Sequence, residues 1–112
     1  MSYEVVILKS AEQDLKDLRL YLINHFGKTV WQDSYNKIKS AINNLIAFPY
    51  AGSIPSELES LEMAQYRQII TGINRIIYEV RGQRVYIHLI ADSRRDMKSL
   101  LIKRILRTGD LL

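Results

Sequence analysis

The chain has 112 residues and a mass of 13.1 kDa, which is enough for one compact core and too little for two ordinary domains. Hydrophobic residues make up 47% and charged residues 25%, as is typical of a folded domain, and no apolar run approaches the roughly 18 residues that span a bilayer. The lack of cysteine excludes disulfides and thiolate nucleophiles, and the two histidines lie too far apart in sequence for a metal motif. We therefore expect a single domain over residues 1–112, without a signal peptide, metal or cofactor, located in the cytoplasm and not at a membrane.

Charge is divided unevenly along the chain. The net charge is +4, but residues 1–66 carry −2 and residues 67–112 carry +6. A basic C-terminal half favours a polyanion or an acidic protein as the partner. Composition alone is equally compatible with a solvated surface that keeps a small domain soluble.

The first half predicts a strand followed by a helix. The apolar run from Tyr3 to Leu8 predicts a short, mostly buried strand. Ser10 and Gln13 form a capping box that opens the helix, and Gly27 closes it. The apolar residues of this helix recur at helical spacing: Ala11, Leu15, Leu18, Leu22 and Phe26.

A second helix begins near Thr29 and ends before Pro49, because the residue that precedes a proline is pushed out of helical geometry. Its apolar stripe consists of Trp31, Tyr35, Ile38, Ile42 and Leu45. Since only Gly27 and Lys28 separate the two helices, we expect an antiparallel helix hairpin.

In the second half the hydrophobic period changes. Residues 49–63 predict a loop with one weak helical turn, and Gly82 suits a two-residue turn between strands. Three runs predict strands, at 64–70, 74–80 and 84–91. Asp96 then caps a short basic helix that runs to Leu106. The predicted fold class is α+β, with a three-stranded antiparallel meander packed on the helix hairpin.

The turn at Gly82 predicts the register and the two faces of the last hairpin. The expected pairs are Arg81–Arg84, Val80–Val85, Glu79–Tyr86, Tyr78–Ile87, Ile77–His88 and Ile76–Leu89. One face is apolar and fits against the helices: Ile76, Tyr78, Val80, Val85, Ile87 and Leu89. The other face is expected to be exposed, cationic and partly aromatic, and carries Arg75, Ile77, Glu79, Arg81, Arg84, Tyr86 and His88. On this face we expect Glu79 to form a surface ion pair with Arg81 or Arg84.

Five segments, in their order and spacing, resemble one known family. They are Ala11-Glu12-x-Asp14-Leu15, Leu45-x-x-Phe48-Pro49-x-x-Gly52, Asn74-Arg75-Ile76-Ile77-Tyr78-Glu79-Val80, Ala91-Asp92-Ser93-Arg94-Arg95-Asp96-Met97 and Leu100-Leu101. Together they extend over nearly the whole chain and resemble the RelE/ParE superfamily of bacterial toxins from type II toxin–antitoxin modules. The resemblance implies the fold predicted above and a cognate antitoxin whose C-terminal segment wraps the toxin.

The superfamily is divided between two activities. RelE-like members cut mRNA in the ribosomal A site, whereas ParE-like members poison DNA gyrase. The resemblance to the nucleases places Arg75 and Arg94 at two arginine positions, Arg67 and Ile69 at two lysine positions, and Leu100 at that of a tail tyrosine. Metal-free RNA cleavage needs a base, a cationic clamp and an acid. The guanidinium of Arg67 stays protonated and leucine has no proton to donate, so the base and the acid are weakened.

Three functional hypotheses remain. The first, which the weakened base and acid favour, is a DNA gyrase inhibitor without catalytic residues that blocks replication, arrests growth and is neutralised by an antitoxin. The second is a ribosome-dependent, metal-independent mRNA endoribonuclease that uses Arg67, Arg75, His88 and Arg94. In it, His88 would act as an exposed base or acid, because the ordinary pKa of histidine is about 6.5. The third is a binding module that has lost its toxicity.

Exposed arginines are the candidates for binding the target. Arg94 and Arg95 precede the tail helix, and Arg75 lies on the cationic sheet face that is expected to lead toward them. The alternative is a capped helix start with two solvated arginines.

The antitoxin is expected on the helix hairpin and at an unpaired sheet edge, which invites strand addition. Leu20, Tyr21 and Ile23 lie beyond the core stripe and widen the apolar surface of the hairpin. The alternative is that these three residues complete the core of the chain itself.

Overall fold

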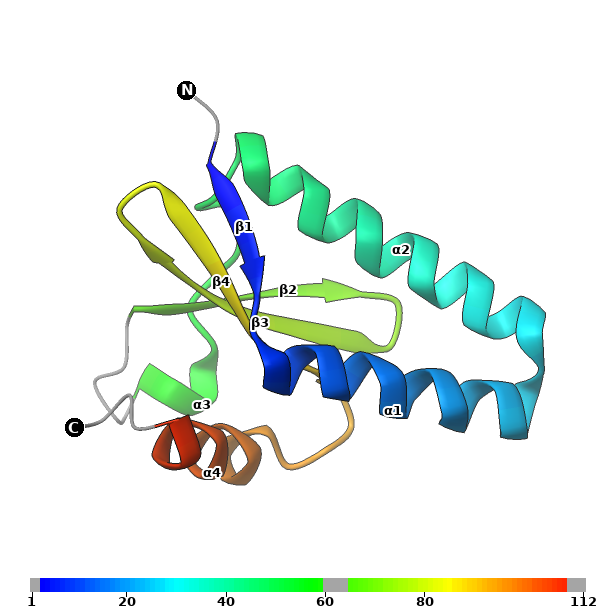
Figure 1. Cartoon of the computed structure of the whole chain (residues 1–112). Helices are drawn as coiled ribbons and strands as arrows, with labels where there is room; N and C mark the ends of the chain where they lie inside the picture. The colour runs from blue at the N-terminus through cyan, green and yellow to red at the C-terminus, as the bar shows by residue number, and fades with distance from the viewer. Residues whose placement is uncertain (1–2, 60–64, 109–112) are drawn as a thin grey trace.

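The computed structural model describes residues 3–59 and 65–108, which form one four-stranded sheet with helices on both sides (Figure 1). In chain order the elements are β1 (Glu4–Ile7), α1 (Lys9–Phe26), α2 (Lys28–Ala47), α3 (Ser56–Glu59), β2 (Tyr66–Thr71), β3 (Asn74–Arg81), β4 (Arg84–Asp92) and α4 (Met97–Thr108). The strand order is β1-β4-β3-β2, with β1 parallel to β4 and the other pairs antiparallel. The predicted α+β fold is confirmed. Ala64 and the end of the predicted loop lie outside the described residues.

Gly27 alone joins the two long helices into the expected hairpin. Its φ of +92° suits glycine, and its N–H donates to the carbonyl of Ile23 at 3.1 Å, which ends α1. The caps predicted for the starts of these two helices are wrong. Helix α1 already begins at Lys9, without a side-chain cap from Ser10, and α2 begins at Lys28, one residue before Thr29. None of the described helices is long and apolar enough to cross a membrane.

The first core lies between the helix hairpin and one face of the sheet. Its buried members come from both helices and from β3 and β4: Ala11, Ile38, Ile42, Leu45, Ile76, Tyr78, Val85, Ile87 and Ile90. The β1 strand adds only partly buried side chains, so the expectation of a mostly buried strand is wrong. It lies at the edge of the sheet, where only β4 pairs with it.

A second core occupies the opposite face of the sheet, which we expected to be exposed. Helices α3 and α4 lie on this side (Figure 1), and the buried cluster consists of Leu58, Tyr66, Ile77, Leu89, Ala91, Met97 and Leu101. The prediction of an open cationic face is therefore wrong for most of its length. Only the end near the β3–β4 turn keeps exposed arginines, Arg81 and Arg84.

A break in the β3–β4 register decides which side chains of β4 join the second core. The ladder pairs Arg81 with Arg84 and continues as predicted to the pair of Tyr78 with Ile87. The register then shifts between Ile77 and Tyr78, and the pairs become Ile77–Leu89 and Ile76–Ile90. The predicted pairs Ile77–His88 and Ile76–Leu89 are wrong because one extra residue in β4 reverses which side chains point to each face.

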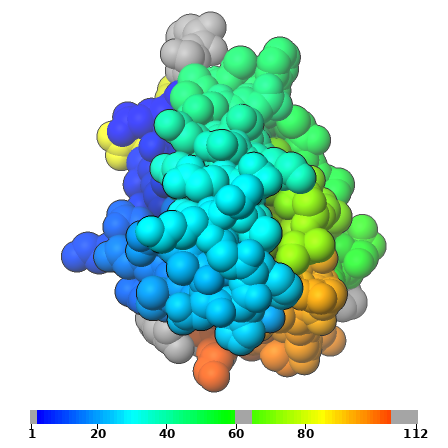
Figure 2. Space-filling view, turned by 90° about the vertical axis from the view of Figure 1, so that its right-hand side faces the viewer, coloured from blue at the N-terminus to red at the C-terminus, as the bar shows by residue number. Residues whose placement is uncertain are grey.

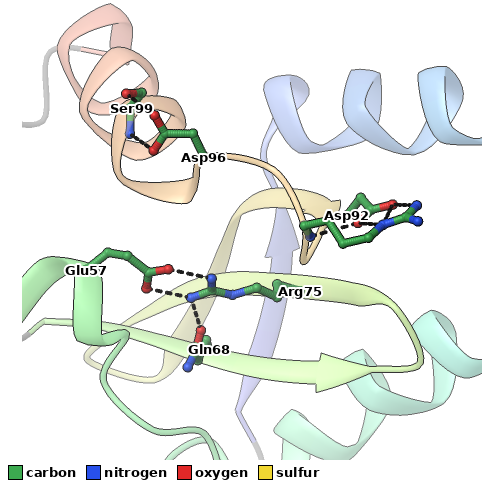
Figure 3. Close-up of polar contacts among 7 residues, drawn as sticks. Glu57, Gln68, Arg75, Asp92, Asp96 and Ser99 are labelled. Atoms are coloured by element: carbon green, nitrogen blue, oxygen red, sulfur yellow. Dashed lines mark hydrogen bonds and ion pairs between the residues drawn. The ribbon is translucent and has the colours of Figure 1, made fainter.

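Two sets of polar contacts fix the position of helix α4. Asp96 caps it as predicted, since its carboxylate accepts the N–H of Ser99 at 3.2 Å and the hydroxyl of Ser99 at 2.8 Å (Figure 3). Arg104 donates to both carboxylate oxygens of Asp14 in α1, at 3.0 and 2.8 Å, and to the carbonyl of His88 at 2.8 Å. The same carboxylate of Asp14 accepts the N–H of Ile90. One ion pair thus joins the last helix to the first.

Gly52 lies where the loop after α2 crosses the sheet. Its N–H donates to the hydroxyl of Tyr78 at 2.9 Å, and the neighbouring Ser53 pairs with Gln68 of β2. A methyl group on Gly52 would overlap the carbonyl oxygen of Gln68 and lie 2.7 Å from the hydroxyl oxygen of Tyr78. The site therefore has room only for glycine.

We predict that Gly52→Ala lowers the free energy of unfolding by about 1–3 kcal/mol, because the loop must move away from the sheet to admit the methyl group. Tyr78→Phe should cost about 1–2 kcal/mol, because it leaves the buried N–H of Gly52 without an acceptor. Urea denaturation followed by circular dichroism measures both. Ser53→Ala, at an exposed neighbouring position, is the control, and an unchanged stability of Gly52→Ala would contradict the close approach.

Candidate functional site

Arg75 is buried and neutralised, in contrast to the expected exposed position. Its guanidinium donates two hydrogen bonds to the carboxylate of Glu57, at 2.7 and 2.8 Å, and a third to the side-chain carbonyl of Gln68 (Figure 3). Only 7% of the residue is exposed. The hydrogen bonds from Arg75 lower the pKa of Glu57 to about 2. Arg75 thus fastens α3 to the sheet and has no free face for a phosphate or a partner.

His88 is also buried, with 3% of its surface exposed, so the expectation of an exposed base or acid is wrong. Its Nε2 lies 3.1 Å from a carboxylate oxygen of Glu79, and the ring of Tyr66 packs edge-on against the imidazole at 5.2 Å. Glu79 pairs with Arg81 at 2.9 Å as predicted, but the carboxylate is buried and not on the surface. The second core therefore separates His88 from any large substrate.

Arg67 binds the loop that follows α2. It donates to the carbonyl oxygens of Gly52 at 2.7 Å and Tyr50 at 3.4 Å, and its guanidinium lies 5.0 Å from the centre of the Tyr50 ring. Of the four residues of the nuclease hypothesis, Arg67, Arg75 and His88 are thus engaged inside the fold. Only Arg94 is exposed.

Arg94 and Arg95 are exposed on the loop between β4 and α4, as expected. The Nε of Arg94 donates to Asp92 at 2.9 Å, and the backbone N–H of Arg94 donates to the same carboxylate at 2.8 Å. This pairing lowers the pKa of Asp92 and raises that of Arg94. Within residues 3–59 and 65–108, the side chain of Arg95 makes no hydrogen bond or ion pair at contact distance, and its charge helps to lower the pKa of the nearby Asp92.

The two predicted contact surfaces meet in one groove, which has a volume of about 490 Å³. Its walls are α1 and the loop after β4, and it is lined by Asp14, Asp17, Leu18, Tyr21, Leu22, Phe26, Ile73, Ile90, Ala91, Asp92, Arg94 and Arg95. Tyr21, predicted to bind the antitoxin, thus lies in the same groove as Arg94 and Arg95, predicted to bind the target. Leu20 is 57% exposed outside the groove, and Ile23 is half-buried. Leu20 and Tyr21 therefore do not complete the core.

Ile73, Ile90 and Asp17 also line this site, although none of them was predicted from the sequence. Ile73 is half-exposed in the β2–β3 turn, and its carbonyl accepts the N–H of Ser93 at 2.7 Å, which draws the arginine loop toward the turn. Ile90 reaches the groove because of the register shift in β4. An exposed isoleucine in a tight turn is the one local signal that was present. No group of three potential metal ligands occurs among the described side chains.

A comparison with models of protein families identifies the family of this chain. Residues 5–97 match the model of the ParE toxin of the type II toxin–antitoxin system parDE. The chain belongs to this family. It is therefore a toxin of the RelE/ParE superfamily, and the resemblance inferred from the sequence is confirmed.

Solved structures of the superfamily share the fold. The ParDE system from P. aeruginosa aligns with a TM-score of 0.66 at 16% identity, covering 80% of this chain and 95% of that one. The E. coli toxin RelE, a mutant in the free state, gives 0.61 at 17% identity over 94% of this chain and 99% of that one. The toxin–antitoxin complex RelBE2 from Mycobacterium tuberculosis gives 0.58 at 18% identity, covering 82% and 99%. No curated protein sequence matches this member of the ParE toxin family.

The ion pair of Glu57 with Arg75 predicts a pH-dependent stability. The carboxyl pKa falls from 4.5 to about 2 on folding, so the pair contributes stability that is fully present above pH 4.5 and is lost as the pH falls toward 2. We predict that Glu57→Gln lowers the free energy of unfolding by about 1–2 kcal/mol at pH 7, a value reduced by partial solvation of the carboxylate. Urea denaturation at pH 7, 4.5 and 3 should show the difference from the wild type shrinking. Glu59→Gln, on the exposed end of α3, is the control.

Proposed function

We propose that this toxin arrests growth by binding DNA gyrase through the exposed arginine loop, and that a cognate antitoxin neutralises it. One observation carries the proposal: of the candidate nuclease residues, Arg75 and His88 are buried, Arg67 is half-buried and bound to backbone carbonyls, and only Arg94 is fully exposed. Arg75 is held by Glu57 and Gln68, and Arg67 by two backbone carbonyls. A clamp for a scissile phosphate needs several free donors around one point. A protein interface needs only an exposed patch with anchoring arginines and apolar side chains.

The absence of a tyrosine in the tail supports the same proposal. The last tyrosine in the sequence is Tyr86, in β4, and Leu100 packs beside the second core where the resemblance to the nucleases implies a tyrosine. Since gyrase acts in the cytoplasm, the toxin is proposed to remain there. The proposal of an antitoxin is supported by the family and by the toxin–antitoxin complexes to which the fold is similar.

The first prediction of this proposal concerns purified gyrase. The toxin should inhibit DNA supercoiling and increase the amount of cleaved DNA, and the double variant Arg94→Gln with Arg95→Gln should lose at least about tenfold in potency, because anchoring arginines carry much of the energy of an interface. The double variant should keep its melting temperature, since both side chains are exposed. Lys98→Gln with Lys103→Gln removes two charges from exposed positions of α4 and serves as the matched control.

An unchanged DNA topology at saturating toxin would contradict the gyrase proposal. Primer extension on mRNA after a short induction then tests the nuclease alternative, which requires cuts within translated codons. Arg75→Ala does not distinguish the two mechanisms in a growth assay, because it leaves Glu57 unpaired and weakens the fold in both.

A second prediction concerns the antitoxin. The double variant Leu20→Ser with Tyr21→Ser should weaken antitoxin binding by about tenfold or more, because both side chains expose apolar area on α1. Isothermal titration calorimetry with the antitoxin encoded beside the toxin measures the loss. Ile46→Ser, partly exposed on α2 away from the groove, is the control. Undiminished affinity of the folded double variant would remove α1 from the antitoxin interface.

A further inference from the structure

Hydrogen bonds hold the backbone of the arginine loop between β4 and α4, although this loop lies at the surface. The segment that follows β4, orange at the lower right of Figure 2, lies beside the helix hairpin. The N–H of Ser93 donates to the carbonyl of Ile73 at 2.7 Å. The N–H groups of Arg94 and Arg95 donate to the carboxylate and the carbonyl of Asp92, at 2.8 and 3.2 Å respectively. Two of these three bonds therefore end on Asp92.

The side chain of Asp92 also holds the guanidinium of Arg94. Its two oxygens accept the Nε–H of Arg94 at 2.9 and 3.2 Å, and one of them accepts an N–H of Nη2 (Figure 3). Asp92 is the last residue of β4, and its side chain is 18% exposed, against 73% for Arg94. An exposed ion pair contributes little to the stability of a fold, which leaves the orientation of Arg94 as its main effect.

The contact with Asp92 leaves one end of the guanidinium open. A guanidinium has five N–H donors in a planar fork. Nε and Nη2 form one edge of the fork and donate to Asp92, whereas Nη1 makes no hydrogen bond to any of the described residues. The Nη1–Nη2 end therefore faces away from Asp92. A carboxylate of a partner can bind at this end in a bidentate pair.

We propose that Asp92 is a positioning residue for the target, in that it fixes the arginine loop and presents the open end of the Arg94 guanidinium to a carboxylate of the partner. The inference rests on the proposed function, in which Arg94 contacts gyrase. A long side chain that is already ordered loses less conformational entropy when it binds, so the complex is tighter. This advantage is lost when Arg94 is released into solvent.

Simple electrostatics gives Asp92 the opposite role. A carboxylate beside two arginines lowers the positive potential of the loop and repels an acidic partner. On that ground alone Asp92→Asn should tighten binding, whereas loss of positioning should weaken it. Asparagine has nearly the shape of aspartate, and its side-chain carbonyl can still accept the backbone N–H of Arg94. The sign of the effect therefore separates the two roles.

Inhibition of DNA supercoiling by purified gyrase measures this sign. We expect Asp92→Asn to raise the toxin concentration for half-inhibition by about three- to tenfold, as the release of an ordered arginine implies. Asp17→Asn is the matched control, because it removes an exposed carboxylate of α1 from the same groove and its partner is Gln13, not Arg94. Its potency should be unchanged or slightly higher. Unchanged or higher potency of Asp92→Asn, or an equal loss in Asp17→Asn, would overturn the proposal.

A double-mutant cycle separates positioning from damage to the loop. When Arg94 is already replaced, as in Arg94→Gln, the additional change Asp92→Asn should alter potency by less than about twofold, because Asp92 acts through the guanidinium. A general defect of the loop would instead weaken the toxin by the same factor with and without Arg94, and this result would contradict the proposal.

The orientation of Arg94 is measured without gyrase, by NMR of the full ¹⁵N-labelled chain made by cell-free synthesis. The Nε–H of Arg94 donates to Asp92, whereas the Arg95 side chain donates to no group within residues 3–59 and 65–108. The Nε–H of Arg94 should therefore exchange with water about two- to tenfold more slowly than that of Arg95, and Asp92→Asn should remove the difference. Equal rates in the wild type would refute the role of Asp92, whereas a wild type without effect on gyrase would refute the proposed function. The two failures are thus read from separate measurements.

Discussion

The register shift in β4 is the constraint on which the two-sided architecture depends. One additional residue opposite the junction of Ile77 and Tyr78 reverses the alternation of side chains, so that Ile90 joins the core under the helix hairpin while Leu89 joins the core under α4. Without the shift, the end of β4 would direct Leu89 toward the hairpin and Ile90 toward α4. The groove depends on the same residue, since Ile90 is part of its lining.

Burial of the second face determines what the arginines of this toxin can do. Arg75 lies in β3 and pairs with Glu57 of α3, whereas Arg104 lies in α4 and pairs with Asp14 of α1. Breaking such a buried pair by removing one partner is costly, because the other charge stays behind uncompensated. These side chains therefore hold the helices in place. The exposed positive charge lies instead on the loop before α4, which carries Arg94 and Arg95.

The parts of the fold that depend on local sequence could be predicted. Periodicity predicted both long helices, glycine predicted the hairpin turns at Gly27 and Gly82, and Asp96 was correctly assigned as a helix cap. The errors arose where long-range packing decides. Nothing adjacent to His88 in the sequence marks a bulge, and a buried arginine such as Arg75 looks like a surface residue until Glu57 is seen to reach it. The groove could not be predicted from the sequence, because only the tertiary structure brings Tyr21 and Arg94 together.

The ion pair of Asp14 with Arg104 joins residues 90 positions apart in the sequence. During synthesis, Asp14 and the rest of α1 are made first, and the guanidinium partner of Asp14 is added only 90 residues later. Chains fold from the N-terminus as they are made, and contacts between distant residues form late. The face that α4 covers, with the buried imidazole of His88, must therefore stay open to solvent until Arg104 has been added and has left the ribosome. The first helix is thus made long before the contact that fixes the last helix to it, and the fold closes only when that contact forms.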